Sequence, residues 1–246
     1  MEKNIKSYFK KKKILVTGGT GLIGRPLTSY LKNLGAKVTV VSLDKIKPKS
    51  GIKFIYGNLN DYKFCKKITK KVDYVFHLAG VKGSALVTKT KPSSFYVPLL
   101  MMNTNILEAC RLNRVKKTLY CSSIGAYQNA SIFREKNFKF NSYPMDFFPG
   151  WAKRVAEIQI LSYKKQYKLK NFYIVRPSNV YGPGDNFDEK NAMVIPTLIK
   201  KITKIKEGKT IEIWGDGNEI RDFVFSEDVA YGLIQHYIME QKIMIL

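Results

Sequence analysis

Cysteine and histidine are scarce in this sequence of 246 residues, which contains three cysteines and two histidines. Cys65, Cys110 and Cys121 are odd in number and widely spaced, so they predict neither a disulfide framework nor a zinc-binding motif. His77 and His236 are too few to complete a metal site with them. We therefore expect no metal ion in the functional site.

Long apolar runs are also lacking. No apolar stretch approaches the length of a membrane span. Residues 1–12 carry charges without the apolar core of a secretory signal. The expected location is therefore the cytoplasm, with no membrane contact.

Acidic side chains are few, because 43 Lys and Arg residues face 19 Asp and Glu residues and the formal net charge is +24. Such a charge can indicate nucleic-acid binding. Only seven of the basic residues are arginine, however, and the lysines are scattered along the chain, whereas nucleic-acid-binding proteins concentrate arginine and aromatic side chains in one element. A lysine-rich solvated surface is favoured, and no nucleic-acid partner is expected. The dense run Lys10–Lys13 is expected to be a solvated lead-in to the first strand.

What the chain does have is an alternation of short apolar runs with longer helical stretches. Its length suits one large domain, or one domain with a smaller lobe. The alternation predicts an α/β fold with a parallel sheet covered by helices on both faces. The expected strands are 14–16, 37–43, 54–56, 73–78, 117–121 and 172–175, and the expected helices include 22–34, 95–112 and 151–167.

A glycine-rich loop, VTGGTGLIG, follows the first expected strand and opens the first helix. Gly18, Gly21 and Gly24 let the backbone turn sharply and let a pyrophosphate approach main-chain N–H groups. Asp44 stands twenty residues beyond Gly24, where a carboxylate binds the adenosine ribose and repels a 2′-phosphate. The pattern predicts a Rossmann-type doubly wound fold that binds NAD rather than NADP, a preference that Lys45 weakens a little.

Turn-forming residues become frequent after Arg176, where Pro177, Gly182, Pro183 and Gly184 follow. We expect residues 1–176 to form the NAD-binding Rossmann domain. Residues 177–246 are expected to form a small, partial substrate-binding lobe at the C-terminus.

With these motifs the chain resembles the extended short-chain dehydrogenase/reductases, and within them the NAD-dependent epimerase/dehydratase family, over about Lys13 to Gln235. The family signature Thr-Gly-x-x-Gly-x-x-Gly matches TGGTGLIG, and the blocks GNL, HLAGVK, SSIGAY, RPSNVYGPG and RDFV follow in the family's order. The resemblance implies an NAD cofactor and a UDP- or GDP-linked sugar as substrate.

Several of these blocks are implied to contact the cofactor. Asn58 stands where the family has an aspartate beside the adenine, and Pro177 would pack on the nicotinamide. A lysine at the Lys82 position touches the nicotinamide ribose in 4-epimerases, whereas His77 is expected to be a buried structural residue. The implied cofactor-binding residues are Gly18, Gly21, Leu22, Ile23, Gly24, Asp44, Asn58, Leu59, Leu78, Ala79, Gly80, Lys82, Lys153 and Pro177.

Other blocks are implied to bind the substrate. Ser123 aligns with the hydroxyl that bonds the sugar, and Asn179 with the amide that bonds the phosphates. Arg221 would pair with the diphosphate, because a guanidinium binds such oxygens in a bidentate way. Ile124 and Gly125 supply neither the acidic pair of the dehydratases nor the cysteine of the paired 3,5-epimerases, so both of those reactions are disfavoured.

The family's catalytic Tyr-x-x-x-Lys pair is broken. Its spacing places both side chains on one helix face, where the lysine and the oxidised nicotinamide lower the tyrosine pKa so that a phenolate acts as base. Lys153 is present, but Pro149 stands four residues before it. Tyr143 and Tyr127 are alternative phenols, although a packing role suits each of them better. Otherwise Ser123, Lys153 and water would support a slower or different reaction, or the protein binds its ligands without turnover.

The predicted function is an NAD-dependent nucleotide-sugar epimerase, with C4 as the expected position. A nucleotide-sugar reductase or dehydrogenase and a non-catalytic binding protein remain as alternatives, whereas a nucleic-acid binder would rest on charge alone. The resemblance implies a homodimer that pairs the two long helices, 95–112 and 151–167. Both carry more apolar residues than one buried stripe needs, which agrees with an oligomer. The chain ends where family members continue with another strand and helix, so the substrate lobe is expected to be incomplete.

Overall fold

A computed structural model describes residues 2–45, 50–81, 85–188, 191–206, 208–213, 215–218, 220–239 and 243–245. The helices and strands in chain order are α1 (Glu2–Phe9), β1 (Lys13–Thr17), α2 (Gly24–Asn33), β2 (Lys37–Ser42), β3 (Lys53–Tyr56), α3 (Tyr62–Ile68), β4 (Tyr74–His77), α4 (Ala85–Thr90), α5 (Ser93–Leu112), β5 (Lys117–Cys121), the 3₁₀ turns η1 (Ile124–Ala126) and η2 (Glu135–Asn137), α6 (Phe147–Tyr167), β6 (Phe172–Arg176), β7 (Asn179–Tyr181), α7 (Val194–Lys204), β8 (Phe223–Phe225), α8 (Ser226–Met239) and β9 (Ile243–Ile245).

The main sheet has seven strands in the order β3-β2-β1-β4-β5-β6-β9, and every neighbouring pair is parallel. Val16 in β1 pairs with Val40 on one side and with Phe76 on the other. The strand order reverses between β1 and β4, and such a switch point opens a crevice at the carboxyl ends of the strands. The Rossmann-type doubly wound fold predicted from the sequence is therefore confirmed.

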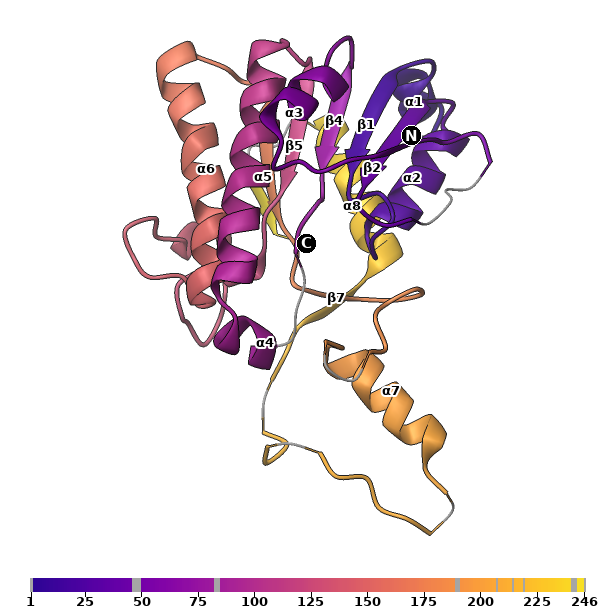
Figure 1. The fold of residues 1–246 in the computed structure, drawn as a ribbon, viewed down its shortest axis with the longest axis vertical. Helices are drawn as coiled ribbons and strands as arrows, with labels where there is room; N and C mark the ends of the chain where they lie inside the picture. Colours follow the sequence, from indigo (N-terminus) through magenta and orange to yellow (C-terminus); the bar gives the residue numbers. More distant parts are fainter. Residues whose placement is uncertain are drawn as a thin grey trace.

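Helices cover both faces of this sheet (Figure 1). Side chains alternate along each strand, so Leu15 and Val75 pack into one core with α3, α5 and α6. Val16 and Phe76 pack into a second core with α1, α2 and α8. Because both faces are buried, the strands read as continuous apolar runs.

Two parts of the chain differ from the sequence-based expectation. The run Lys10–Lys13 leads into β1, whose first residue is Lys13, but it follows a helix, α1, whose Phe9 is fully buried. At the other end of the chain, α8 packs against the main sheet beside α2. Its Val229, Leu233 and Tyr237 are buried in the core on that face. Helix α8 and strand β9 therefore belong to the Rossmann body, although the predicted boundary placed all of 177–246 in the substrate lobe.

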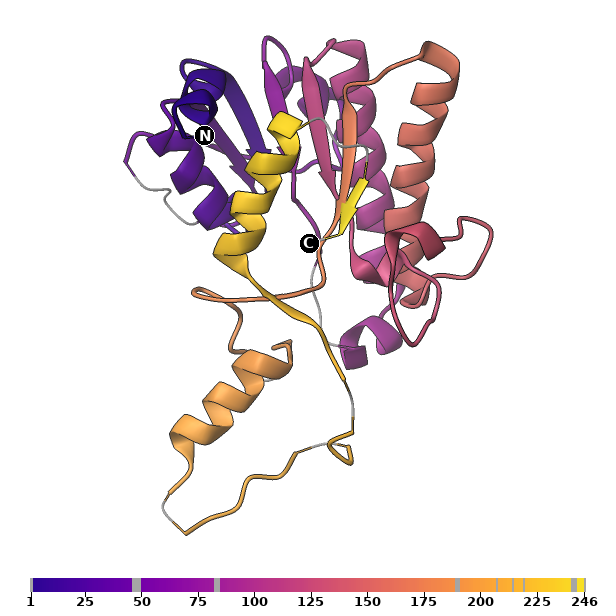
Figure 2. The ribbon, with the colours of Figure 1, turned by 180° about the vertical axis from the view of Figure 1, so that it is seen from behind.

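The segment between β6 and α8 leaves the main sheet. Here β7 and β8 form a separate two-stranded parallel sheet. The helix α7 projects away from the body in both views (Figures 1 and 2) and exposes Val194, Ile199 and Ile202. In both views this projecting segment lies beyond the carboxyl ends of the central strands (Figures 1 and 2).

Candidate active site

The loop between β1 and α2 forms a cradle in which main-chain atoms leave no space for side chains. Gly18 has φ +68°, and a Cβ there would lie 2.8 Å from the Ala79 backbone. A Cβ on Gly24 would collide with the Gly18 carbonyl oxygen. Helix α2 begins at Gly24, and the Ile23 side chain makes no capping bond. The Arg25 N–H already donates to the Gly21 carbonyl oxygen at 3.0 Å, and Pro26 has no N–H. The N–H groups of Leu22, Ile23 and Gly24 are therefore the ones that suit an anion such as pyrophosphate.

Asp44 stands just beyond the end of β2 and is fixed by two hydroxyl groups. The Thr20 Oγ1 donates to Asp44 Oδ2 at 2.5 Å. The Ser42 Oγ lies 2.8 Å from the same threonine hydroxyl and accepts from the Asp44 N–H at 3.1 Å. Asp44 remains exposed, so its carboxylate is held at the rim of the cradle and is accessible to a ribose.

The other implied cofactor residues line the same edge of the sheet. Asn58 is exposed and its Oδ1 accepts from the Asn60 N–H at 3.0 Å, while Leu59 is buried. Leu78 and Ala79 follow β4 and are half-buried, and Gly80 is exposed. Lys82 lies outside the described residues.

His77 ends β4 between the two sides of the crevice and is fully buried. Its Nδ1 lies 2.7 Å from Thr17 Oγ1, and its Nε2 lies 2.9 Å from Asn103 Oδ1. Burial, with the positive charge of Lys153 as a second cause, lowers the pKa of His77 to about 3. A neutral ring that accepts from Thr17 and donates to Asn103 fits these partners, in agreement with the structural role expected for this histidine.

The end of β5 brings together the implied catalytic serine and lysine. Ser123 caps η1, and its Oγ accepts from the Gly125 N–H at 3.1 Å. Lys153 comes from α6, and its Nζ donates to the Cys121 carbonyl oxygen at 2.8 Å. The ammonium also lies 5.2 Å from the centre of the buried Tyr120 ring. Pro177 is buried beside this turn, and its carbonyl oxygen accepts from the Ile124 N–H at 3.1 Å.

The implied diphosphate ligands lie on the chain segment that leaves the sheet. Asn179 begins β7, and its Nδ2 donates to the Asp222 carbonyl oxygen at 2.9 Å. Arg221 is exposed and close enough to Asp146 for their charges to interact. The structure therefore brings Arg221 to the α6 side of the crevice, whereas Asn179 lies at the start of the two-stranded sheet.

The sequence profile of the NAD dependent epimerase/dehydratase family matches residues 14–242. The chain belongs to this family. It is 29% identical over 237 residues to a GDP-L-fucose synthase of Sinorhizobium fredii, which covers 92% of this chain and 71% of that protein.

Solved structures of the same kind superpose well. A UDP-N-acetylglucosamine 4-epimerase from Methanobrevibacter ruminantium M1, in complex with UDP-N-acetylmuramic acid, matches with TM-score 0.81 and 27% identity over 96% of this chain and 76% of that chain. A GDP-L-fucose synthetase from Naegleria fowleri bound to NADP matches with TM-score 0.76 and 28% identity over 96% and 77%. The epimerase/dehydratase family thus contains NAD(P)-dependent nucleotide-sugar epimerases and reductases.

In an epimerase/dehydratase the start of α6 is where the catalytic phenol is expected. Here α6 begins at Phe147, four residues before the predicted start, and Pro149 is its third residue. The first helical bond is donated by the Gly150 N–H to the Asp146 carbonyl oxygen at 2.6 Å, so the missing N–H of Pro149 costs no hydrogen bond. That Pro149 occupies the family's tyrosine position remains a prediction from the sequence.

The two alternative phenols are placed very differently. Tyr127 is 1% exposed, its hydroxyl lies 3.5 Å from Arg176, and burial raises its pKa despite the arginine charge. Tyr143 is 73% exposed, and its ring stacks on Phe147 and meets the edge of Trp151. Tyr127 is thus a packing residue in a buried network, whereas Tyr143 lies on the surface at the entry to α6.

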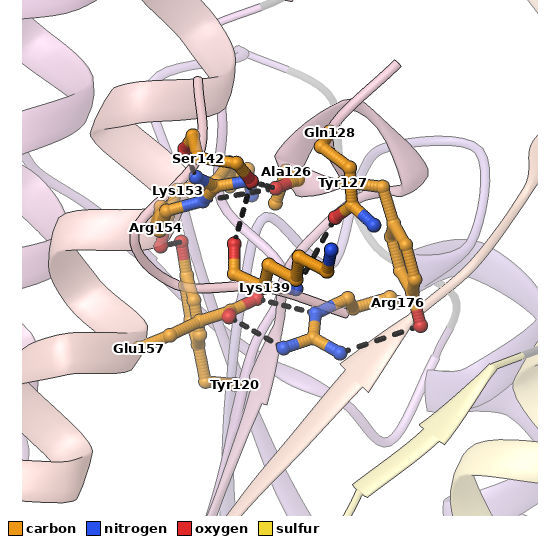
Figure 3. A network of polar contacts seen from close by, with 10 residues as sticks. All are labelled: Tyr120, Ala126, Tyr127, Gln128, Lys139, Ser142, Lys153, Arg154, Glu157 and Arg176. Carbon is orange, nitrogen blue, oxygen red and sulfur yellow. Dashed lines mark hydrogen bonds and ion pairs between the residues drawn. The ribbon is translucent and has the colours of Figure 1, made fainter. Parts of the chain in front are cut away.

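A buried ion pair that the sequence reasoning missed supports this side of the site (Figure 3). Arg176, at the end of β6, donates to both carboxylate oxygens of Glu157 at 2.8 and 2.7 Å. Its guanidinium also lies 3.7 Å from the centre of the Phe138 ring. Both members of the pair are buried. The sequence did hold a hint of this pair, because Glu157 in α6 and Arg176 in β6 are charged residues among mainly apolar neighbours.

A second buried cation fastens the loop after η1 to α6. Arg154 is fully buried and donates from Nε to the Ala126 carbonyl oxygen at 3.0 Å, and from Nη1 to the Ser142 carbonyl oxygen (Figure 3). Because Ala126 closes η1 and Ser142 precedes α6, one side chain holds both ends of the loop. This bond set therefore fixes the position of Ser123 relative to Lys153.

Among the described residues, no three His, Cys, Asp or Glu side chains gather in a way that could hold a metal ion. No helix in the described part of the chain combines the length and apolarity needed to cross a bilayer.

Proposed function

We propose that this protein is an NAD-dependent nucleotide-sugar epimerase that inverts C4 of a UDP- or GDP-linked sugar. One observation carries the proposal. The glycine-rich loop after β1 lies at the same edge of the sheet as Ser123 and Lys153 at the end of β5. Such an arrangement can position a sugar carbon between a hydride acceptor and a proton acceptor. The 4-epimerase among the similar structures supports this reading.

The chain's own residues fit a bound NAD. A Cβ at Gly18 would collide with the Ala79 backbone and one at Gly24 with the Gly18 carbonyl oxygen, so the two glycines permit the tight main-chain turn that would receive the pyrophosphate. Asp44 would bind both ribose hydroxyls and would repel the 2′-phosphate of NADP. When bound, NAD supplies the hydride acceptor and donor of the reaction.

The substrate would lie between the Rossmann body and the segment 177–225, which we propose as the substrate lobe. Ser123 would donate to the sugar hydroxyl or ketone, and Lys153 would hold positive charge beside it. Asn179 and Arg221 would bind the diphosphate, the arginine with its planar pair of donors. These roles keep the sugar carbon in one position while its substituents change.

We also propose a homodimer that pairs α5 and α6 with their copies. The two helices pack side by side, and their outer faces expose Val97, Met101, Leu112, Ile158 and Tyr167. Apolar side chains on the outer faces of two adjacent helices are typical of an interface.

The test is turnover by the purified protein with NAD and a set of UDP- and GDP-sugars. An epimerase produces the C4 epimer, passes through a transient of reduced nicotinamide, and consumes no net cofactor. Absence of both the transient and any product, with NAD bound, would reject the epimerase and leave a non-catalytic binding protein, the reading that Pro149 favours.

A reductase is the second candidate, favoured by the similarity to a GDP-L-fucose synthase. It predicts stoichiometric consumption of reduced cofactor with a 4-keto nucleotide sugar. The same absorbance measurement separates the two, because net oxidation of the cofactor occurs only in the reductase.

A further inference from the structure

Asp146 stands at the N-cap position of α6, but its side chain makes no capping bond to the helix. Aspartate at this position ordinarily accepts from the N–H groups of its own first turn. Here the carboxylate turns the other way, toward η1. A Cβ added to Gly125 would collide with Asp146 Oδ2, so the carboxylate occupies the space where a side chain at position 125 would begin.

The start of α6 is packed tightly onto the serine-bearing turn. The Met145 N–H donates to the Tyr127 carbonyl oxygen at 2.6 Å, and the Asp146 N–H donates to the Gly125 carbonyl oxygen at 3.3 Å. A Cβ on Gly150 would collide with that same carbonyl oxygen. The Asp146 carboxylate is therefore held against the turn that Ser123 begins.

Asp146 also adjoins the start of the helix that carries Pro149 and Lys153. It is the N-cap residue of α6, with an extended backbone, and stands three residues before Pro149 and seven before Lys153. The carboxylate is therefore close in the chain to the position that carries no phenol. It belongs to the nearest acidic residue before Lys153.

The surroundings of this carboxylate suit proton exchange. Asp146 is exposed to solvent, yet the loop atoms packed against it remove enough hydration to raise its pKa, and the charge of Arg221 opposes that rise. Gly125, the residue that it faces in η1, carries no titratable group. A carboxyl whose pKa moves toward neutrality is a better base at physiological pH.

We propose that Asp146 is the proton-transfer residue of this enzyme and takes the place of the missing phenol, an inference that rests on the function proposed above. In the oxidation, the O–H bond at C4 breaks and its proton goes to the Asp146 carboxylate. The C4 hydrogen leaves with its electron pair for the oxidised nicotinamide, which gives the 4-keto sugar and the reduced cofactor. In the reduction, the hydride returns to the opposite face of C4 and the protonated Asp146 gives its proton to the oxygen.

The test compares Asp146→Asn with Asp61→Asn, since both aspartates are N-cap residues and only Asp61 caps its helix, accepting from the Phe64 N–H at 3.1 Å. D146N is expected to lower kcat by about a hundredfold or more, the usual contribution of a general base. Affinity for NAD and for the nucleotide sugar should stay within about twofold of the unsubstituted enzyme. The acid limb of the kcat–pH profile should disappear in D146N and persist in D61N.

A second variant separates catalysis from positioning. D146N combined with Pro149→Tyr places a phenol four residues before Lys153, on the same helix face and before the first helical bond. Recovery of at least a tenth of the original kcat is expected if proton transfer is what Asp146 supplies. Lack of recovery together with weakened sugar binding in D146N would overturn the proposal in favour of a positioning role.

The outcomes also separate this proposal from the proposed function. Turnover by the unsubstituted enzyme with an unchanged kcat in D146N overturns the role of Asp146 alone, as does a loss in Tyr143→Phe that D146N does not show. Absence of turnover in the unsubstituted enzyme with every UDP- and GDP-sugar overturns both.

Discussion

The two halves of the crevice are built from different materials. The half that we propose binds the cofactor, here called the cofactor half, runs from β1 to β3. It consists of main-chain groups and short side chains, with glycines packed against backbone atoms at Gly18 and Gly24. The half that we propose carries the reaction, here called the reaction half, lies around β5, β6 and α6. It consists of long side chains drawn from distant segments, such as Glu157 and Arg176. The cofactor half therefore depends on glycines that lack a side chain. The reaction half depends on pairs of side chains that are far apart in the sequence and meet in the fold.

The two halves should therefore respond to different substitutions. A loop built from main-chain groups is disrupted by any atom added to its glycines, whereas changes of neighbouring side chains have little effect on it. A side-chain framework is broken by loss of one partner, because the remaining buried charge is left without compensation. The largest stability effects should therefore come from the reaction half, and the sharpest binding effects from the cofactor half.

The largest effect is expected from Glu157→Gln. The change keeps the shape of the side chain but leaves the buried Arg176 guanidinium without its counter-charge, which should cost about 3–5 kcal/mol in the free energy of unfolding. Urea unfolding followed by circular dichroism measures this loss. Glu108→Gln is the matched control, since its partly exposed pair with Arg111 at i,i+3 should contribute less than about 1 kcal/mol. Equal effects of the two substitutions would contradict the comparison.

The cofactor half was easier to predict from the sequence than the reaction half. The glycine positions and Asp44 lie within one β-α-β segment, so local spacing was enough to propose them as cofactor ligands, and that role stays a prediction. The pair Glu157–Arg176 was not predicted, because it joins a helix to a strand and single charges in apolar runs do not reveal their partners.

Asp146 escaped the sequence reasoning for a related reason. An aspartate before a helix reads as a cap, and only the backbone bonds between residues 125–127 and 145–146 turn its carboxylate away. The return of α8 to the sheet was likewise missed, because the turn-rich stretch after Arg176 hid the buried face formed by Val229 and Leu233.

Gly24→Ala is expected to disrupt the cofactor half and to lower both the stability and the NAD affinity of the protein. The added Cβ would collide with the Gly18 carbonyl oxygen, so the loop must shift, at a cost of about 1–3 kcal/mol in stability. The NAD dissociation constant should rise by about tenfold or more, because the shifted loop no longer presents its N–H groups to the pyrophosphate. Thermal unfolding and calorimetric titration with NAD measure the two effects. Gly80→Ala serves as the stability control, since its Cβ would meet only Leu99 at 3.8 Å, and an equal loss of stability there would count against the packing argument.

The preference for NAD over NADP should depend on one carboxylate of the cofactor half, that of Asp44. Asp44→Ala removes a charged hydrogen-bond acceptor, and we expect NAD affinity to fall by about tenfold to a hundredfold. Affinity for NADP should fall less or rise, because the repulsion of the 2′-phosphate is also removed. Lys45→Ala is the neighbouring control and should strengthen the preference for NAD. Parallel titrations with both cofactors decide the matter, and an unchanged NAD affinity in D44A would refute the assigned role of the carboxylate.

At neutral pH the smallest effect is expected where the two halves meet, at His77, because its contribution changes only as the pH falls. This ring joins Thr17 of the cradle strand to Asn103, whose Nδ2 donates to the Tyr120 hydroxyl at 3.0 Å. Its folded-state pKa of about 3 lies below the unfolded value of about 6.5. As the pH falls below that unfolded value, the unfolded chain takes up a proton that the folded protein refuses. The stability contribution is therefore complete above about pH 6.5 and is lost toward pH 3, at about 1.4 kcal/mol per pH unit.

His77→Gln keeps a donor and an acceptor in the site but cannot titrate. Its unfolding free energy should fall less steeply between pH 7 and pH 4 than that of the unsubstituted protein, by the slope of about one proton. His236, whose pKa burial lowers to about 4, lies on the opposite face of the sheet and contributes a similar slope of its own, so His236→Gln controls for histidine loss alone. If H77Q alone also weakens NAD binding at neutral pH, then His77 transmits the geometry of the reaction half to the cradle. If it changes only the pH slope, the two halves are assembled independently on a shared sheet.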